Sequence, residues 1–266
     1  MSGGSIASEK SALRTRMRDT IGPIARSARA LAARRAADIA LRSPPFARAQ
    51  LVLAYRAMHD EIDVDPLVRA LCARGVRIAF PLVLPEAIDA PKLSANVEAS
   101  DEGRTSPDSL RALRLLAIDA RDPLSADPSD ADLWRTDRYG IRAPNLESPR
   151  VRRVLPREID AVIVPGRAFD ARGARLGRGK GFYDALLARL RPDARAATVG
   201  LAFEAQCVDR VPEDGHDARV AWIATERCLR RAVDPERPPR VRAITDEIAA
   251  IDGDDAPRAP DTPDCT

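Results

Sequence analysis

Residues 159–190 constrain the fold of this 266-residue chain more than any other stretch. The stretch begins with a short run rich in Ile and Val between Pro156 and Pro165, which is the pattern of a buried strand. A polar loop with five glycines follows, and from Phe182 to Leu190 apolar residues recur at helical spacing. The stretch therefore predicts a strand, a glycine-rich loop and a helix in direct succession.

The loop is also cationic, because Arg172, Arg175, Arg178 and Lys180 stand between its glycines. Glycine lets the backbone approach a ligand closely, and successive backbone N–H groups then form a concavity that binds anions. The N-terminus of the following helix adds unpaired N–H groups and a partial positive charge. Arginine and lysine side chains add affinity for phosphate. The unit therefore predicts a binding site for a polyphosphate.

The two commonest phosphate-binding motifs do not match this loop. A Walker A motif requires Ser or Thr after its lysine, but Gly181 follows Lys180, and the glycines at 177, 179 and 181 are spaced GxGxG rather than GxGxxG. The alternative interpretation is a flexible, solvated basic loop. The chain has only three lysines, however, and Lys180 is one of them. Since arginine cannot replace a compact ammonium group, the presence of a lysine at position 180 favours a specific phosphate contact.

Composition excludes several other classes of protein. The net charge is +3 with acids and bases interspersed, and aromatic residues make up 4% of the chain, so we expect no nucleic-acid surface. The four cysteines form no CxxC pair, which argues against a zinc site or a disulfide framework. No apolar run is long enough for a membrane span, and residues 1–10 lack the apolar core of a signal peptide. We expect a cytoplasmic monomer without a membrane partner.

The remaining pattern predicts one α/β domain over residues 1–230, with inserted loops at about 82–137, and a Pro- and Asp-rich, largely disordered tail over residues 231–266. Expected helices cover residues 8–20, with Ser8 as N-cap, and residues 24–42. The stretches 51–55, 64–74 and 76–80 predict a βαβ unit with Gly75 at C′ and with Pro81 ending the second strand. Further strands are expected at 113–118, 196–202 and 220–225, and Trp134 is expected to anchor the inserted region.

The loop and its flanks, VPGRAFDARGARLGRGKGFYDALL, resemble the signature of the 5-formyltetrahydrofolate cyclo-ligase family, roughly PG-x-x-FD-x-x-G-x-RLG-x-G-x-GYYD. Arg167 stands where an aliphatic residue is usual, and Phe182 where Tyr is commoner. The stretch that ends in VAWIATE also resembles the C-terminal part of that family. Residues 139–144 resemble its G-x-x-EP turn, but Ala143 replaces the acid. The resemblance covers roughly residues 10–226.

The resemblance implies a three-layer α/β/α sandwich around a mainly parallel sheet. It also implies ATP- and Mg²⁺-dependent cyclisation of 5-formyltetrahydrofolate to 5,10-methenyltetrahydrofolate, with release of ADP and phosphate through a phosphorylated formyl intermediate. The catalytic residues would be Arg175, Arg178 and Lys180. The ATP-binding residues would be Lys10, Arg14, Arg175, Leu176, Gly177, Arg178, Gly179, Lys180, Gly181, Phe182 and Tyr183. The folate-binding residues would be Arg56, Met58, Glu61, Arg178, Gly179, Lys180, Gly181 and Phe182, and the Mg²⁺ ligands Asp184 and Asp217.

Without the resemblance, several of these residues have simpler interpretations. Lys10 and Arg14 lie four residues apart on one helix face, which is also the pattern of a solvated surface. Glu61 would be an acid near a helix start, and Asp217 a turn residue.

Two other functions remain open at this point. The same scaffold would serve as a folate- or nucleotide-binding module that has lost catalysis, which the departures at Arg167 and Ala143 favour. It would also serve as a sugar-phosphate isomerase or acyl-transferase relative, which would need no ATP.

Overall fold

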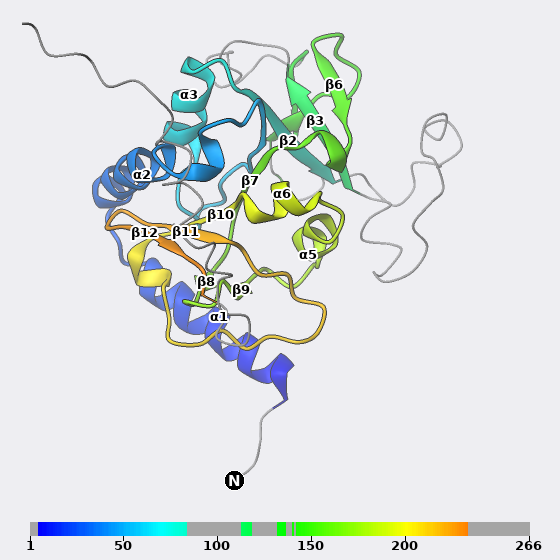
Figure 1. Cartoon of the computed structure of the whole chain (residues 1–266). Coiled ribbons are helices and arrows are strands. Elements are labelled where there is room, and N and C mark those ends of the chain that lie inside the picture. The colour runs from blue at the N-terminus through cyan, green and yellow to red at the C-terminus, as the bar shows by residue number, and fades with distance from the viewer. Residues whose placement is uncertain (1–4, 84–112, 119–131, 137–139, 141, 234–266) are drawn as a thin grey trace, which may run out of the picture. The chain divides into compact units, whose positions relative to one another are not determined.

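An eight-stranded sheet in the order β12-β11-β10-β7-β1-β2-β3-β6 forms the centre of this computed structural model (Figure 1). The structure describes residues 5–83, 113–118, 132–136, 140 and 142–233. The strands are β1 Leu51–Leu53, β2 Arg77–Val83, β3 Leu113–Ile118, β6 Val151–Val154, β7 Ala161–Val164, β10 Thr198–Leu201, β11 Trp222–Ala224 and β12 Leu229–Arg231. The five from β11 to β2 pair in parallel, whereas β3, β6 and β12 pair antiparallel with their neighbours. The predicted α/β fold with a mainly parallel sheet is confirmed.

The other elements surround this sheet. The helices are α1 Ile6–Ile21, α2 Arg26–Leu41, α3 Asp65–Ala73, α5 Phe182–Leu187 and α6 Pro192–Ala196, with 3-10 turns at Pro44–Phe46, Pro156–Glu158 and Glu204–Gln206. Two small ladders join β4 Trp134–Thr136 to β5 Arg142–Pro144, and β8 Ala168–Phe169 to β9 Arg175–Leu176. Among the described helices, none has the length and apolar character that crossing a bilayer requires.

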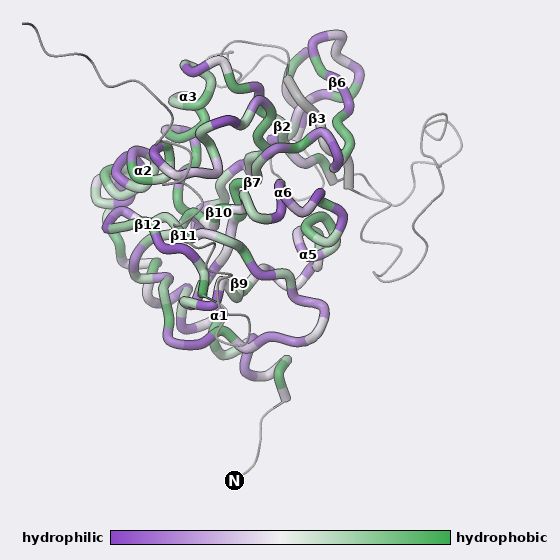
Figure 2. Tube along the Cα trace, viewed as in Figure 1, coloured by the Kyte–Doolittle hydropathy of each residue, from purple (hydrophilic) through white to green (hydrophobic). Residues whose placement is uncertain are grey.

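Alternation along the strands produces three layers. In β7, Ala161 and Ile163 pack in the core formed with α2 and α3, whereas Val162 and Val164 pack in the core formed with α5 and α6. This follows from the pleat of a strand, which sends successive side chains to opposite faces. Hydrophobic stretches accordingly lie in the central strands and along parts of the helices (Figure 2). The predicted α/β/α sandwich is confirmed.

The first helix packs mainly against the small β8–β9 ladder, and its last residue, Ile21, reaches the core formed with α2 and α3. Leu13 and Met17 form a separate apolar cluster with Ala168, Leu176 and Val211. The prediction of Ser8 as N-cap is wrong. The N-cap is Ser5, three residues earlier, and its hydroxyl accepts a 3.3 Å hydrogen bond from the backbone amide of Ser8. Ser8 itself lies within the first turn of the helix.

Two predicted boundaries need correction. Pro81 does not end the second strand, because β2 continues to Val83 by pairing with β3. β1 pairs with β2 only at residues 77–79, so at Pro81 the β1 side has no neighbouring strand and the missing N–H costs little. Helix α5 ends at Leu187 rather than at Leu190. Pro192 favours extended backbone at Arg191, with ψ of 152°, which prevents the helix from continuing.

Other predictions are confirmed. β1, α3 and β2 form the expected βαβ unit, and Gly75 follows α3 with φ of 81°. The strand at 113–118 is present, and Trp134 meets the ring of Phe80 edge-on at 5.5 Å. Most of the predicted insertion, residues 84–112 and 119–131, lies outside the described residues. The tail from residue 234 also lies outside the described residues. The compact unit that contains the sheet ends at Val233, three residues after the predicted boundary at residue 230.

One turn requires glycine for two independent reasons. Gly173 has φ of +80°, a left-handed conformation that side chains rarely adopt. A Cβ at this position would lie 2.1 Å from the carbonyl oxygen of Val220, whose amide donates a 2.8 Å hydrogen bond to the Gly173 carbonyl. This turn within the cationic loop therefore depends on a backbone contact that no other residue allows.

We predict that Gly173→Ala lowers the free energy of unfolding by about 2 kcal/mol or more, through backbone strain and the clash with Val220. Gly215→Ala is the matched control, because a Cβ there meets nothing within 4 Å and its φ is not positive. Urea denaturation measures both variants. Equal stability of the two variants would contradict this account.

Candidate active site

A pocket of about 380 Å³ opens beyond the carboxyl ends of β1, β2 and β7. This is the edge of a parallel sheet at which ligands bind in α/β proteins. The pocket is lined by Tyr55, Arg56, Met58, Glu61, Pro81, Pro165, Gly166, Arg167, Arg175, Gly177, Arg178, Gly179, Lys180, Gly181, Phe182, Tyr183 and Asp184. The glycine-rich loop and the segment after β1 therefore face the same space.

The start of the cationic loop is fixed by an aromatic ring between two glycines. A Cβ on Gly166 or on Gly200 would lie 2.5 Å from the Phe169 ring, so both positions must lack a side chain. Gln206, buried at 1% exposure, donates hydrogen bonds to the carbonyl oxygens of Gly166 at 2.9 Å and Arg167 at 3.1 Å. These contacts hold the backbone where β7 meets the pocket.

A buried carboxylate holds the next turn. Asp170 is 1% exposed and accepts hydrogen bonds from the backbone amides of Arg172 at 2.9 Å, Ala174 at 3.1 Å and Val211 at 3.0 Å. The guanidinium of Arg172 supplies the balancing charge at 2.7 Å. The β8–β9 ladder and the segment at residue 211 are thereby joined beneath the pocket.

Arg175 lies in the wall of the pocket rather than at its surface. Its side chain is 4% exposed, and its Nη2 donates to Asp184 Oδ1 at 2.8 Å. The guanidinium also lies 5.7 Å from the centre of the Tyr183 ring. A Cβ on Gly177 would come within 2.8 Å of Arg175 Nη1, so this glycine makes room for the arginine. The charged group of Arg175 is therefore paired with Asp184, which also lines the pocket.

Arg178 lies across the pocket, where it pairs with two acids from the segment after β1. Its Nε donates to Glu61 Oε1 at 3.1 Å, and its Nη2 pairs with Asp60 Oδ1. The other Glu61 oxygen accepts a 2.9 Å hydrogen bond from the Met58 amide. Arg167, the departure from the family pattern, pairs with the other Asp60 oxygen at 2.6 Å. Sequence reasoning did not identify Asp60 as part of the site.

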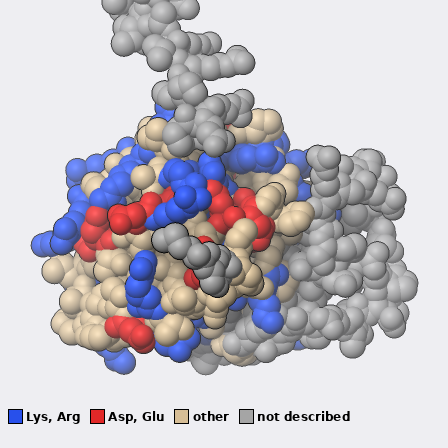
Figure 3. Space-filling model, turned by 90° about the horizontal axis from the view of Figure 1, so that it is seen from below, with Lys and Arg blue, Asp and Glu red and all other residues tan. Residues whose placement is uncertain are grey.

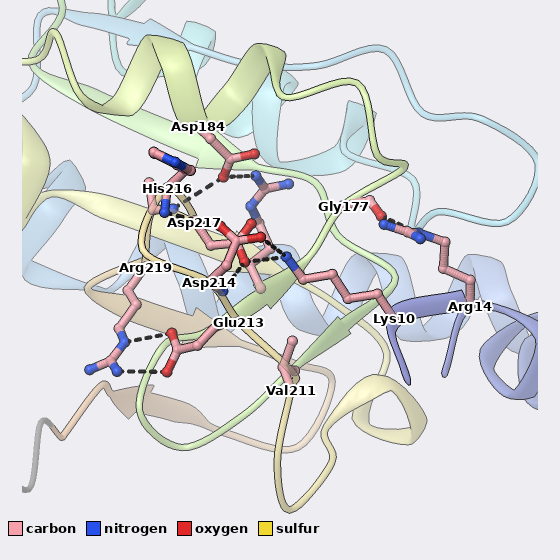
Figure 4. A network of polar contacts seen from close by, with 12 residues as sticks. Lys10, Arg14, Gly177, Asp184, Val211, Glu213, Asp214, His216, Asp217 and Arg219 are labelled. Atoms are coloured by element: carbon pink, nitrogen blue, oxygen red, sulfur yellow. Dashed lines mark hydrogen bonds and ion pairs between the residues drawn. The ribbon is translucent and has the colours of Figure 1, made fainter. Parts of the chain in front are cut away.

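Helix α1 places two cations beside the pocket, as Figure 4 shows. Arg14 Nε donates to the Gly177 carbonyl oxygen at 3.0 Å, directly beneath the glycine-rich loop. Lys10 Nζ pairs with Asp214 at 2.9 Å and with Asp217. Burial alone lowers the pKa of Lys10, but its hydrogen bonds to Asp217 and Asp214 outweigh burial and raise that pKa. The structure therefore brings the predicted helix face to the site, and it adds Asp214, which the sequence pattern did not indicate.

The two expected Mg²⁺ ligands come from neighbouring segments. Asp184 Oδ1 accepts a 3.2 Å hydrogen bond from the amide of Ala218, next to Asp217 (Figure 4). Glu213 holds the same loop, since it accepts from Arg219 at 2.7 and 2.9 Å and pairs with Arg172 at 2.9 Å. Among the described residues, no group of three or more His, Cys, Asp or Glu side chains is arranged to hold a metal alone. A metal at Asp184 and Asp217 would need further ligand oxygens from a bound molecule.

The remaining predicted residues also line the pocket, with Lys180 exposed at its surface, except for Leu176. Leu176 is buried in the apolar cluster with Leu13 and Met17 instead. Arg56 pairs with Asp65 at 2.8 Å and lies 5.4 Å from the centre of the Trp134 ring. Helix α5 has six residues after Gly181, so its dipole contributes less than a long helix would. Ala143, where the family carries an acid, does not line the pocket and packs with Leu82.

The surface at the α1 end carries both signs of charge. Figure 3 shows Lys and Arg side chains next to Asp and Glu side chains over this face. Such a mixed surface matches the ion pairs described above rather than one continuous basic patch.

The sheet, with an arginine- and glycine-lined pocket at the carboxyl ends of its strands, defines an α/β protein with a candidate ligand site at that edge. The sequence profile of the 5-formyltetrahydrofolate cyclo-ligase family matches residues 6–226. The chain therefore belongs to the 5-formyltetrahydrofolate cyclo-ligase family.

Individual relatives agree with this assignment. The 5-formyltetrahydrofolate cyclo-ligase of Escherichia coli K12 is 28% identical over 183 residues, which cover 68% of this chain and 81% of that protein. The mouse enzyme is 34% identical over 90 residues, which cover 33% of this chain and 44% of that protein, so this match spans less than half of the mouse relative.

Two solved structures are similar. The NMR structure of Aquifex aeolicus 5,10-methenyltetrahydrofolate synthetase has a TM-score of 0.59 and 25% identity, and the match covers 88% of this chain and 97% of that one. A 5,10-methenyltetrahydrofolate synthetase from Mycoplasma pneumoniae has a TM-score of 0.53 at 17% identity, covering 82% and 98%, and supports the fold alone.

Two tyrosines that line the pocket, the buried Tyr55 and the half-buried Tyr183, differ in their hydrogen bonds. Tyr55 donates to the Ile62 carbonyl oxygen at 2.8 Å, whereas the hydroxyl of Tyr183 is buried without a partner among the described residues. Burial, and secondarily the charge of Glu61, raises the pKa of Tyr183, so the hydroxyl stays protonated and can donate to a ligand. An unpaired buried donor in a pocket-lining residue indicates a partner that arrives with the ligand.

We predict that Tyr183→Phe leaves the ligand-free protein at least as stable as the wild type, because it removes an unpaired polar group. Tyr55→Phe removes a made hydrogen bond and should lower the free energy of unfolding by about 1–3 kcal/mol. Chemical denaturation of both variants tests the difference. Destabilisation by Tyr183→Phe as large as that by Tyr55→Phe would show that the Tyr183 hydroxyl already has a partner.

Proposed function

We propose that the chain is an ATP- and Mg²⁺-dependent 5-formyltetrahydrofolate cyclo-ligase that forms 5,10-methenyltetrahydrofolate, ADP and phosphate. The observation that carries this proposal is the pocket in which Arg178 and Glu61 meet beside an exposed Lys180. Such a pocket offers cations to a phosphate and a carboxylate to a heterocycle in one place. Family membership and the relatives named above support the same reaction.

The reaction needs a phosphate because a formamide oxygen is a poor leaving group. Transfer of the terminal phosphoryl group of ATP to that oxygen gives a phosphorylated formyl intermediate and ADP. The neighbouring amine nitrogen of the folate then attacks the formyl carbon, and phosphate leaves with the oxygen as the ring closes. Catalysis of the first step consists mostly of positioning the two substrates and neutralising the charge that spreads over the phosphoryl oxygens.

The residues of the pocket suit these tasks. Arg178 and Lys180 would bind the transferred phosphoryl group, and Lys10 and Arg14 would reach the rest of the nucleotide from α1. Glu61 would accept the adjacent N–H donors of the pterin ring in a bidentate way. Met58, Phe182 and the Tyr183 hydroxyl, for which the described residues provide no partner, would complete the walls around the ligands.

Asp184 and Asp217 would hold Mg²⁺ together with phosphate oxygens, because hard oxygen ligands are what this ion prefers. The ion would supply positive charge to the phosphates. Both carboxylates are paired with side-chain cations here, Asp184 with Arg175 and Asp217 with Lys10, which shows that each site attracts positive charge. In the part of the chain that the structure describes, these two carboxylates belong to no group of three metal-binding side chains, which fits an ion that the nucleotide would complete.

The binding-module alternative loses part of its support. Ala143 does not line the pocket, so the replacement of an acid by alanine at this position leaves the lining of the pocket unchanged. The expected monomeric state and cytoplasmic location remain predictions.

We predict that Lys180→Ala retains the fold but lowers turnover about 100-fold or more, because it removes a charge that acts on the transferred phosphoryl group. The measurement is near-ultraviolet absorbance of the methenyl product, with purified protein, 5-formyltetrahydrofolate and Mg-ATP. An assay without ATP shows the background, and isothermal titration with Mg-ATP separates binding from chemistry.

Arg189→Ala is the matched control for this experiment, since Arg189 is an exposed cation just after α5 that does not line the pocket. We expect Arg189→Ala to react at the wild-type rate. Wild-type turnover by Lys180→Ala would remove Lys180 from the mechanism. Absence of product from the wild type, with Mg-ATP still bound, would favour the binding module, and absence of nucleotide binding would favour an ATP-independent relative.

We predict that Asp217→Asn and Asp184→Asn each raise the Mg²⁺ concentration required for half-maximal turnover about tenfold or more, because each removes a charged ligand. Asp193→Asn is the control, since Asp193 is an exposed acid that pairs with Arg191. Titration of turnover with MgCl₂ at saturating ATP measures the shift. An unchanged Mg²⁺ requirement in Asp217→Asn and Asp184→Asn would remove these residues as ligands.

A further inference from the structure

Four side chains of alternating charge form a row at the pocket, which Arg167, Arg178 and Glu61 line and Asp60 does not. Arg167 pairs with Asp60 at 2.6 Å, Asp60 pairs with Arg178, and Arg178 donates to Glu61 at 3.1 Å. The two acids are adjacent in the segment after β1, and the two arginines come from the segments after β7 and β9. The row is therefore electrically balanced in the absence of any ligand.

The proposed reaction requires this row to open. A phosphoryl group that binds Arg178 and a pterin ring that binds Glu61 would each compete with the Arg178–Glu61 contact. When Arg178 turns toward phosphate, it also leaves Asp60, whose side chain is 9% exposed. A buried carboxylate without a counter-ion is strongly unfavourable. Asp60 would therefore oppose the movement of Arg178 toward phosphate unless a second cation remained paired with Asp60.

Arg167 supplies that remaining cation from a fixed position. Its backbone amide donates to the Leu176 carbonyl oxygen at 2.8 Å, and its carbonyl oxygen accepts from Gln206 at 3.1 Å. Its side chain is 14% exposed. Its Nε is buried and makes no hydrogen bond among the described residues, so the guanidinium is engaged through the edge that faces Asp60.

We propose that Arg167 is a positioning residue that neutralises Asp60 permanently and so allows Arg178 to exchange its carboxylate partners for the phosphate groups of ATP. This inference rests on the proposed function and assigns a role to the residue that departs from the family pattern. Arg178 alternates between Asp60 and phosphate, while Arg167 stays on Asp60 in both states. The binding of the pterin ring to Glu61 assists the exchange, because it removes the second carboxylate from Arg178.

We predict that Asp60→Asn restores the phosphate affinity that Arg167→Leu lowers. Arg167→Leu, which restores an aliphatic residue, leaves Arg178 as the counter-ion of Asp60 and should weaken binding of inorganic tripolyphosphate and of Mg-ATP about tenfold. The double variant Arg167→Leu/Asp60→Asn removes the carboxylate that retains Arg178, and its affinities should return to within about threefold of the wild type. Isothermal titration with both probes measures binding, and the absorbance assay measures turnover.

The control is Arg167→Leu/Asp63→Asn, which has the same net charge but keeps Asp60, since Asp63 is an exposed acid in the same segment. We expect no rescue in this variant. Rescue by Asp63→Asn would mean that net charge alone explains the effect. Failure of Asp60→Asn to rescue would mean that Arg167 contacts the ligand directly, and wild-type affinity of Arg167→Leu would mean that Arg167 has no role.

The same experiment keeps the two proposals apart. The wild-type protein tests the proposed function, because it must bind Mg-ATP and form the methenyl product. The ratios between the variants test the role of Arg167. Product formation by the wild type together with any of the three contrary results would overturn the inference and leave the proposed function in place.

Discussion

Three of the cations at the site, Arg175, Arg178 and Lys10, pair with carboxylates of the protein, and this constraint explains much of the site. Arg175 pairs with Asp184, Arg178 with Asp60 and Glu61, and Lys10 with Asp214 and Asp217. Several cations in a half-buried pocket would repel one another and lose hydration without such partners. In the proposed function, the same acids would become available to a metal ion or a pterin ring when phosphate binds the cations.

The fold brings these partners together from distant parts of the chain. The carboxyl ends of β1 and β7 place the acids after β1 opposite the arginines after β7 and β9. Helix α1 brings Lys10 to the loop at residues 211–219 by packing on the β8–β9 ladder. The buried carboxylate of Asp170 joins that ladder to Val211, at the start of the loop that carries Asp214 and Asp217. Gly173 and Gly177 make room for the contacts that this arrangement needs.

Sequence patterns predicted the strands and the βαβ unit of the sheet, and the resemblance to the cyclo-ligase family implied its three layers and most residues that line the pocket. They succeeded because strand periodicity and the long loop signature are local properties of residues 159–190. They did not identify Asp60 or Asp214 as site residues, since an acid next to a recognised acid carries no separate signal until the fold shows its partner. They placed the cap of α1 at Ser8 rather than Ser5 and ended β2 at Pro81, because both depend on neighbours that only the folded chain provides.

A crystal structure with a non-hydrolysable Mg-ATP analogue and 5-formyltetrahydrofolate would test the central claim most directly, namely that the pocket exchanges carboxylates for phosphate. The account predicts that Arg178 leaves Asp60 for the terminal phosphate, that Lys10 leaves Asp217, and that Arg167 remains on Asp60. A complex in which both ligands are bound while Arg178 still pairs with Asp60 and Lys10 still pairs with Asp217 would contradict it.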